Sequence, residues 1–382
     1  MHVFLENFQS ITWQMVVMWV IGALLIYLAI KKDMEPTLLL PMGFGAILIN
    51  LPLPAVAEAA ETTGVAAVLE TLYNAGIRNE LFPLLLFIGI GAMIDFGPLL
   101  SNPKMLLFGA AAQFGIFFTL SMASLLGFDL TDAASIAIIG AADGPTSIVV
   151  AEHYGTKYMG AIVVAAYSYM ALVPIVQPPC IRLITTKKER LIRMPYNPKQ
   201  ISKTTRILFP ILVTMIAGLA APDSVALIGF LMFGNLLREC GVLNSLSDTA
   251  QKVLANLITL LLGITVAFSM QASEFLQPET LMILALGLVA FIFDTFGGVL
   301  FAKLLNLFLK EKINPMVGAA GISAFPMASR VVHKMGLKED PNNFLLMHAA
   351  GANVAGQIAS VIAGGLIMAL VVQGGYIHGF PY

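Results

Sequence analysis

Charged side chains are scarce in this sequence, and cysteine is nearly absent. Only 11% of the 382 residues are charged, 58% are hydrophobic, and the mean hydropathy is +0.87. Because a soluble domain carries about 25% charged residues, these values exclude an ordinary soluble protein and indicate a polytopic membrane protein. The two cysteines, Cys180 and Cys240, form no CxxC motif. We therefore expect neither a disulfide framework nor a structural zinc site.

Basic charge in excess is also missing, since the formal net charge is −1. This balance gives no support to a nucleic-acid partner. The first ten residues contain neither Lys nor Arg, so we expect no cleavable signal peptide. What the chain does have is 33 glycines and 20 prolines, a composition that suits close helix packing and broken helices within a bilayer.

The apolar segments predict an all-α polytopic membrane protein with about ten transmembrane spans and two re-entrant broken-helix hairpins in inverted repeats. The expected spans are residues 12–30, 37–51, 81–100, 104–127, 157–182, 207–221, 224–240, 252–272, 279–309 and 343–373.

Two further stretches lie among these spans but are broken by proline, glycine and polar residues. Residues 131–155 carry an Asp-Gly-Pro triplet at 143–145, and residues 312–335 contain two prolines, two serines and an arginine. Irregular backbone at membrane depth is tolerated only where protein or a water-filled cavity satisfies it. We therefore expect both stretches to be hairpins that line a site.

The two hairpins belong to blocks that resemble each other. The sequence GAADGPTSIVV leads from Gly140 to Gly155, and a similar stretch leads from Gly318 to Gly336. Each is preceded by two apolar segments and followed by one that carries polar groups. Internal repeats are the usual build of secondary transporters. The alternative is a chance likeness between two helices rich in glycine and alanine.

The distribution of basic residues predicts that the repeats are inverted. Lys31, Lys32 and the basic loop 183–206 are expected on the cytoplasmic side. An even number of crossings must separate them, yet five apolar segments lie between, so residues 131–155 must enter and leave on one side. The second repeat then starts on the opposite side from the first. We expect the tips of the two hairpins to meet near the midplane.

This reasoning divides the chain into six parts. They are the N-terminal scaffold spans and outer loop (1–80), the first inverted repeat (81–182), the basic cytoplasmic loop (183–206), a linking helical pair (207–251), the second inverted repeat (252–373) and a tail (374–382).

Asp143 is the acidic residue in the interior of the first hairpin. An ionisable group inside a bilayer suggests a functional site, and a carboxylate beside freed backbone carbonyls suits Na⁺. The alternative is a helix cap before Gly144-Pro145. Asn353 offers a neutral amide oxygen to a cation, or an amide bond between helices. Asp95 is expected to cap a helix, and Asp294 lies within a span without an assigned role.

Arg330 lies at the inner end of the second hairpin. Its guanidinium matches a carboxylate bidentately, so it could bind a carboxylated substrate from the cytoplasm; alternatively it anchors the helix at the membrane surface. Asn314, before a proline, is most simply an N-cap. Tyr169 could pass a proton, although membrane tyrosines more often pack or lie at the interface.

Four motifs then carry a resemblance to a known family. GAADGPTSI (140–148), FGGVLFAKLLNLF (296–308), INPMVGAAGISAFPMASRVV (313–332) and GANVAGQIAS (351–360) resemble the β subunit of sodium-translocating biotin-dependent decarboxylases. These complexes act on oxaloacetate, methylmalonyl-CoA, glutaconyl-CoA or malonate. The resemblance extends over most of the chain, from about residue 12 to residue 373.

The resemblance implies a membrane subunit that receives carboxybiotin at its cytoplasmic side, decarboxylates it with uptake of a proton, and exports Na⁺. The matching residues are implied to bind Na⁺ (Asp143, Asn353, Asn314 and Gly318), to bind carboxybiotin (Arg330 and Asn314) and to catalyse its decarboxylation (Arg330, Ser323, Tyr169 and Asp143).

The resemblance also implies partners. The chain has no Ala-Met-Lys-Met biotin-attachment motif, so a biotin-carrying subunit and a carboxyltransferase subunit must supply carboxybiotin in trans. The family forms homotrimers, with a small single-span γ subunit in some complexes, in a bacterial or archaeal inner membrane. Two alternatives stay open at this stage. One is a sodium-coupled secondary transporter, for Na⁺/H⁺ or Na⁺/carboxylate, with no decarboxylase chemistry. The other is a purely structural membrane subunit.

Overall fold

The protein is almost wholly helical. A computed structural model describes residues 9–32, 35–52, 65–196, 200–372 and 376–377. The only strands in that part of the chain are β1 (Val371–Val372) and β2 (Tyr376–Ile377), which pair antiparallel after the last helix. The predicted all-α polytopic class is confirmed. The expectations for the N-terminal eight residues, for residues 53–64 of the outer loop and for most of the tail fall outside the described residues.

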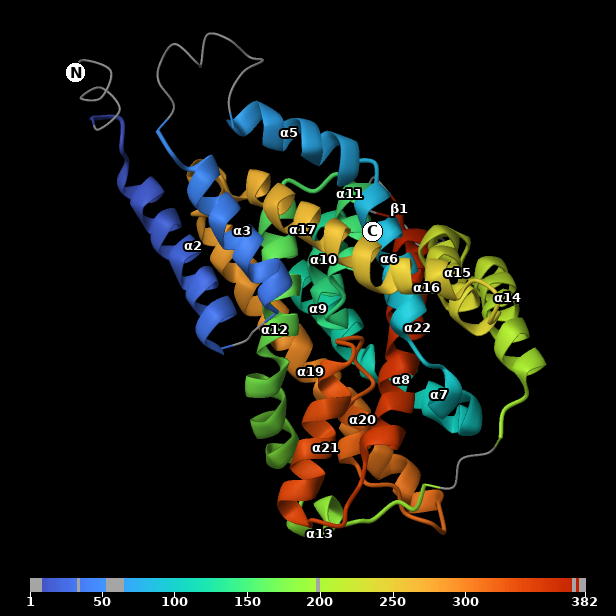
Figure 1. Ribbon diagram of the computed structural model, residues 1–382. Helices are drawn as coiled ribbons and strands as arrows, with labels where there is room; N and C mark the ends of the chain where they lie inside the picture. The colour runs from blue at the N-terminus through green and yellow to red at the C-terminus, as the bar shows by residue number, and fades with distance from the viewer. Residues whose placement is uncertain (1–8, 33–34, 53–64, 197–199, 373–375, 378–382) are drawn as a thin grey trace.

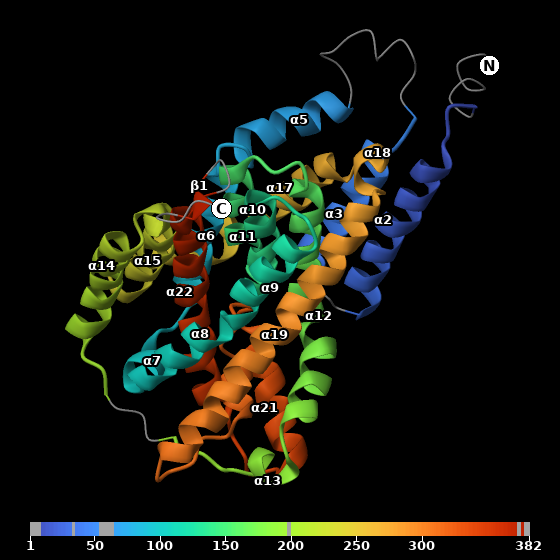
Figure 2. The ribbon, with the colours of Figure 1, turned by 180° about the vertical axis from the view of Figure 1, so that it is seen from behind.

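One group of helices flanks the molecule, and we call it the flanking group. It comprises α2 (Trp13–Lys32), α3 (Pro36–Ile49), α6 (Leu81–Met93), α14 (Lys203–Ala220), α15 (Val225–Glu239) and α17 (Ala255–Val266). Within it, α3 packs on α2 and α17, and α6 packs on α15 and α17. Figure 1 shows α2 and α3 at one flank and α14 and α15 at the other, and the reverse view in Figure 2 agrees.

A second group, the central bundle, carries both hairpins. From the first repeat it takes η1 (Pro103–Met105), α8 (Leu106–Ala112), α9 (Phe114–Leu125), α10 (Leu130–Ala137), η2 (Ile138–Ala141), α11 (Gly144–Tyr154) and α12 (Met159–Ile184). From the second it takes α19 (Pro278–Phe308), α20 (Met316–Ala319), α21 (Met327–Glu339) and α22 (Leu346–Leu370). Helix α19 packs on α12 and α9, and α22 packs on α8 and α21.

Short elements connect these helices. They are α5 (Val65–Gly76), α7 (Gly97–Ser101), α13 (Lys187–Arg190), η3 (Pro222–Ser224), α16 (Asn244–Asp248), the π-helical η4 (Thr249–Leu254), η5 (Ala267–Met270) and α18 (Ala272–Phe275). Helix α5 was not predicted, because residues 52–80 were expected to be a loop. Apolar residues recur at 65, 68, 69, 72 and 73, which is helical spacing, and α5 meets α6 at 62°.

The number of membrane-length helices follows from length and composition. Seven of the described helical segments are long and apolar enough to cross a bilayer, or eight if the bent pair α5–α6 is one span. They include α2, α12, α14, α19 and α22. Three of the ten expected spans are not among these membrane-length segments. They correspond to α3, α6 and α15, which are shorter helices. Each of these short helices is nonetheless packed among its neighbours in the flanking group.

The basic ends of several helices gather at one end of the molecule. Lys32 of α2 and Arg182 of α12 line one cavity with Lys338 of α21. The stretch before α20 lies there too, because the Asn314 side chain donates to the carbonyl of Arg190. We call this the basic end; it is the side predicted to be cytoplasmic. In Figure 1, α10 and α11 of the first hairpin lie toward the opposite end of the molecule from α13 and α21, the arrangement that the sequence prediction of inverted repeats calls for.

Candidate functional site

The first hairpin is broken sharply beside Asp143. Ala142 has a left-handed φ of 51°, which ends η2, and Asp143 itself is extended. Pro145 then lies in the first turn of α11, where its missing N–H is not needed. The local sequence thus places the Asp143 carboxylate between two half-helices. Its side chain is buried, with 2% of the residue exposed.

Hydroxyl groups rather than cations surround this carboxylate. Its Oδ2 accepts hydrogen bonds from Thr146 Oγ1 at 2.8 Å and from Ser360 Oγ at 3.0 Å. Among the described residues, no Lys, Arg or His forms an ion pair with Asp143. A buried carboxylate needs a compensating positive charge or a proton. The site is therefore built for a small cation or a proton.

The tips of the two hairpins meet, as the sequence predicted. Ser323 of the second hairpin donates two hydrogen bonds to the Ala141 carbonyl of the first, from its backbone N–H at 3.2 Å and its Oγ at 2.6 Å. Both residues are fully buried. The contact lies two residues from Asp143. It joins the predicted proton-handling serine to the predicted ion-binding hairpin.

Helix α22 runs past both tips and contacts each with a polar side chain. Asn353 Nδ2 donates to the Ile322 carbonyl at 2.7 Å, and Gln357 Nε2 donates to the Ser323 carbonyl. One turn further on, Ser360 donates both to the Gln357 carbonyl at 3.1 Å and to Asp143. The three side chains share one face of the helix. They connect the second hairpin to the carboxylate of the first.

Each side-chain amide on this face of α22 has an oxygen that accepts no hydrogen bond. Asn353 Oδ1 and Gln357 Oε1 are buried and have no hydrogen-bond partner. Gln177 of α12 repeats the pattern, since its Nε2 donates to the Ala319 carbonyl at 2.6 Å and its Oε1 is unpartnered. Buried polar atoms without partners are costly, so these oxygens are available to bind a ligand. Oxygen atoms are the donors that Na⁺ takes from broken helices.

Two tyrosines on α12 lie near this region in different ways. A Cβ added at Gly144 would lie 2.1 Å from the ring of Tyr167, so the ring packs directly on the start of α11. The Tyr167 hydroxyl is buried without a partner. The predicted residue, Tyr169, instead donates its hydroxyl proton to the Leu284 carbonyl of α19. The structure thus places Tyr167 against the Asp143 break and Tyr169 against α19.

Asn314 and Gly318 lie at the base of the second hairpin. Asn314 Nδ2 donates to the carbonyls of Arg190 and Ile192 at 2.8 and 2.9 Å, and its Oδ1 accepts from the Met316 N–H at 3.1 Å. Asn314 thus accepts from the first residue of α20, although the residue in the N-cap position is Pro315, and its amide has no free hydrogen. Gly318 packs against α19, where an added Cβ would lie 2.1 Å from the Gly298 carbonyl oxygen. Both residues position the hairpin.

Arg330 lies apart from the buried network. It is exposed on α21 and lines a cavity of about 830 Å³ at the basic end, together with residues of α12 and of the connection between α2 and α3. Small-molecule sites typically have about 300–1,000 Å³. The Arg330 guanidinium has no acidic partner among the described residues. It is free to bind an anion that enters from this end.

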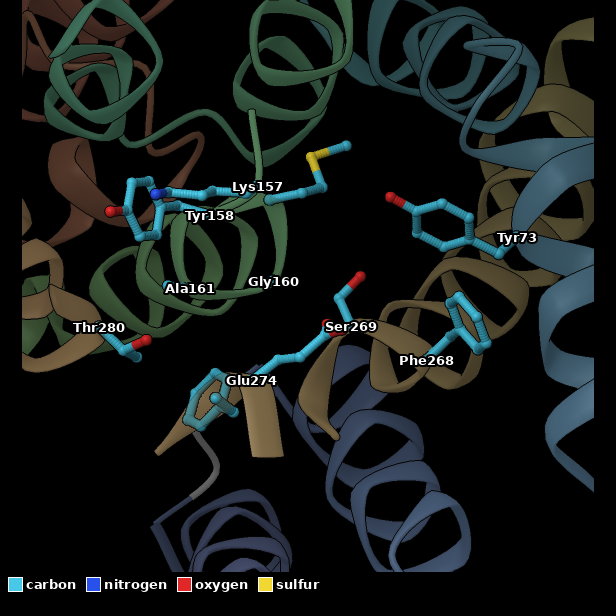
Figure 3. Close-up of a pocket in the computed structure, with 11 residues that line it drawn as sticks. Tyr73, Lys157, Tyr158, Gly160, Ala161, Phe268, Ser269, Glu274 and Thr280 are labelled. Atoms are coloured by element: carbon cyan, nitrogen blue, oxygen red, sulfur yellow. The ribbon is translucent and has the colours of Figure 1, made fainter. Parts of the chain in front are cut away.

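A smaller cavity of about 200 Å³ lies at the opposite end of α12 (Figure 3). Tyr73 and Ser269 line it from α5 and η5, and Lys157, Glu274 and Thr280 line its other sides. Like the larger cavity, it lies between the central bundle and elements outside it. The two cavities therefore open at opposite ends of the same boundary.

The other two membrane carboxylates have structural partners. Asp294 is fully buried in α19, and its Oδ1 accepts from the Gly115 N–H at the start of α9. It thereby caps the second half of the broken α8–α9 segment. Asp95 Oδ1 accepts from the Gly97 N–H at 2.8 Å, at the first residue of α7, although the residue in the N-cap position is Phe96, and it also pairs with Arg206 at 3.3 Å.

Sequence reasoning missed Gln357, Ser360 and Gln177. The first two were visible as a pattern, because 353, 357 and 360 are spaced by four and three residues and fall on one helical face. Both lie within the GANVAGQIAS motif. Gln177 had no such signal. Its partner, Ala319, is 142 residues away in the sequence, so only the fold brings them together.

Comparison with known proteins identifies the family. A family model described as Na⁺-transporting oxaloacetate decarboxylase beta subunit matches residues 14–371. The chain belongs to this family. It is 48% identical to the glutaconyl-CoA decarboxylase subunit beta of Acidaminococcus fermentans, over 96% of each chain. It is 48% identical to the methylmalonyl-CoA decarboxylase subunit beta of Propionigenium modestum, over 95% of this chain and 96% of that protein.

A third relative is the oxaloacetate decarboxylase beta chain of Klebsiella pneumoniae, which is 45% identical over 93% of this chain and 95% of its own length. Together these matches show that the chain is a membrane subunit of a sodium-transporting decarboxylase. They do not favour the alternative of a secondary transporter without decarboxylase chemistry. The relatives differ in the acid that their complexes are named for.

Proposed function

We propose that this chain decarboxylates carboxybiotin and couples that reaction to the export of Na⁺ through the site around Asp143. The observation that carries the proposal is the buried network that joins the hairpin tips. In it a carboxylate without a cationic partner is linked through the Ser360 hydroxyl to α22, the helix that carries two buried amide oxygens without partners. The family match supplies the sodium transport and the decarboxylase activity.

The sodium ligands in this proposal come from both repeats. Asp143 supplies the charge from the first hairpin, and Asn353 and Gln357 supply neutral oxygens from α22. The amide groups of Asn353 and Gln357 donate to the carbonyls of Ile322 and Ser323. Their side-chain oxygens are therefore oriented toward the ion only when the second hairpin is in place. Movement of that hairpin would therefore change the affinity for Na⁺. Asn314 and Gly318 contribute by holding the hairpin.

The chemical step consumes one proton. Cleavage of the bond between the ureido nitrogen and the carboxylate carbon releases CO₂, and the nitrogen takes the proton. Arg330 would bind the carboxylate at the basic end, where the 830 Å³ cavity admits it. Ser323 and Tyr169 are the groups we propose for handling the proton. Na⁺ and this proton would compete for Asp143, which ties the chemistry to transport.

The partners in the proposal are a biotin-carrying subunit and a carboxyltransferase subunit that deliver carboxybiotin in trans. We further propose a homotrimer of this chain, a small γ subunit in some complexes, and a bacterial or archaeal inner membrane as the location. The relatives are named for complexes that act on oxaloacetate, methylmalonyl-CoA and glutaconyl-CoA. The acid used by this complex depends on the carboxyltransferase.

The test replaces Asp143 by Asn in the assembled complex, reconstituted in proteoliposomes. Decarboxylation and ²²Na⁺ uptake are measured together while the acid substrate is supplied. We expect both rates to fall at least about 100-fold, the scale on which removal of one charge-stabilising group acts. Full Na⁺-coupled decarboxylation by Asp143→Asn would refute the assignment. Na⁺/H⁺ exchange by the wild-type chain without a biotinylated partner would instead favour a secondary transporter.

A further inference from the structure

The cavity at the basic end is strongly asymmetric in charge. Five basic side chains line it, whereas Glu35 is the one acidic residue among the described lining residues. The five are Lys32 of α2, Arg182 of α12, and Arg330, Lys334 and Lys338 of α21. A concave surface that carries one sign of charge concentrates ligands of the opposite sign. The cavity therefore attracts anions more strongly than a single arginine would.

Three other basic residues near this end are neutralised by carboxylates. Arg190 pairs with Glu339 at 2.8 Å, Arg193 with Asp340 at 2.5 Å and Lys303 with Glu189 at 3.2 Å. Glu339 and Asp340 directly follow Lys338 in the sequence, yet both are engaged by the segment after α13. The Arg193 guanidinium lowers the pKa of Asp340, so that carboxylate stays ionised in its pair.

The cavity residues differ from these. Among the described residues, no carboxylate lies within ion-pair distance of Arg182, Arg330, Lys334 or Lys338. Glu339 of α21 and Asp340 directly after it are thus engaged elsewhere, and the basic face of α21 has no counterion within the described part of the chain. Like charges spaced four residues apart destabilise a helix. A surface of this kind is stabilised when an acidic partner covers it.

The positions on α21 form a graded path. Arg330, Lys334 and Lys338 are spaced by four residues, so they share one face, and they extend over about 12 Å at 1.5 Å per residue. Arg330 is the innermost, one turn from Pro326, and Lys338 is nearest the end of the helix. All three are exposed. Arg182 lies on α12, across the same cavity.

We propose that Lys334, Lys338 and Arg182 form a docking surface for an acidic face of the protein that carries the carboxylated biotin group, while Arg330 receives the carboxylate. The inference rests on the proposed function. One carboxylate is satisfied by one guanidinium, so the three further cations have no role toward the small molecule alone. Charge complementarity at the rim of an interface increases the association rate and its salt dependence.

The test uses the wild-type chain in proteoliposomes of neutral phosphatidylcholine, with the biotinylated partner subunits added from outside at fixed Na⁺. Lys334→Glu/Lys338→Glu is compared with Lys334→Gln/Lys338→Gln and with Lys187→Glu/Lys188→Glu. The control pair is exposed on α13 and does not line the cavity. The partner concentration at half-maximal decarboxylation, the maximal rate and the effect of added KCl are measured.

We expect the charge reversal at 334 and 338 to raise the half-maximal partner concentration about tenfold, with the maximal rate within about twofold of wild type. The glutamine pair should give a smaller increase, and the control pair none. Added KCl should raise the half-maximal partner concentration most in wild type, less in the glutamine pair and least in the glutamate pair. An equal shift in the control pair, or an unchanged half-maximal concentration, would overturn the proposal.

Two further arms separate the remaining outcomes. Cosedimentation of the uncarboxylated biotinylated partner measures docking without turnover. Loss of docking in the glutamate pair supports the surface even if the decarboxylation chemistry were assigned wrongly. Wild-type turnover with unaltered docking in both variants would reject the surface and leave the proposed function intact. A shift that appears only in vesicles with anionic lipid would assign the cations to lipid headgroups and reject the proposal.

Discussion

The two hairpins are built from similar sequences but differ in almost every structural respect. In the first, the half-helix α11 begins immediately after Asp143 and is nearly all buried. In the second, α20 spans only Met316–Ala319, an irregular stretch follows, and α21 then presents basic residues to a cavity. The first hairpin supplies a charge to the buried network, whereas the second supplies backbone carbonyls to that network and basic side chains to the cavity at the basic end.

This difference explains how an inverted repeat can serve two tasks. Its two halves meet at Ala141 and Ser323, so a change in the position of either tip is transmitted to the other. The amides of α22 then link that contact to Asp143. In the proposed function, the substrate end and the ion end are therefore separate sites that are joined by this contact. Variants should be able to damage one while sparing the other.

The largest expected effect separates the two hairpins directly. Arg330→Gln should lower the decarboxylation rate about 100-fold or more, because the carboxylate loses its bidentate cation. The decarboxylation rate of Arg330→Lys should lie between those of wild type and Arg330→Gln, since lysine keeps the positive charge but loses the planar fork of the guanidinium. Turnover is measured in the reconstituted complex with saturating partner subunits. Near-normal turnover in Arg330→Gln would mean that the second hairpin does not bind the carboxylate.

A smaller effect is expected on α22, between the hairpins. Asn353→Leu and Gln357→Leu each remove an amide oxygen and the bond to a hairpin carbonyl. We expect each to raise the Na⁺ concentration at half-maximal turnover about tenfold, equal to ~1.4 kcal/mol. Gln177→Leu is the matched control, because it breaks a similar bond to the second hairpin but lies on α12, outside the chain of hydrogen bonds by which α22 reaches Asp143. Equal shifts in all three variants would show that hairpin support, and not ligation, sets the affinity.

The smallest effect on sodium is expected at the other buried carboxylate. Asp294→Ala leaves the Gly115 N–H without an acceptor, which should cost about 1–3 kcal/mol and lower the midpoint of thermal unfolding in detergent. Asp294→Asn keeps an acceptor oxygen, so its midpoint of thermal unfolding should fall by less. Neither should shift the Na⁺ concentration at half-maximal turnover more than about twofold. A tenfold shift would add Asp294 to the ion path.

Much of this arrangement followed from the sequence, and its limits have physical causes. The length and composition of the apolar segments predict most of the long helices, because both are local properties of the sequence. The breaks at 143–145 and 312–335 can also be predicted from the sequence, because proline and glycine occur there. The contacts of Gln177 and Tyr167 cannot be predicted in this way, because the neighbours of side chains on α12 come from distant parts of the chain. Helix α5 was missed because its acidic neighbours suggested a loop.

The most direct test of the central claim is equilibrium binding of ²²Na⁺ to the purified chain in detergent. Wild type, Asp143→Asn and Arg330→Gln are compared at the same pH and ionic strength. If the first hairpin holds the ion and the second receives the substrate, Arg330→Gln binds Na⁺ as wild type does and Asp143→Asn does not bind it. Retained binding in Asp143→Asn, or its loss in Arg330→Gln alone, would contradict this division between the hairpins.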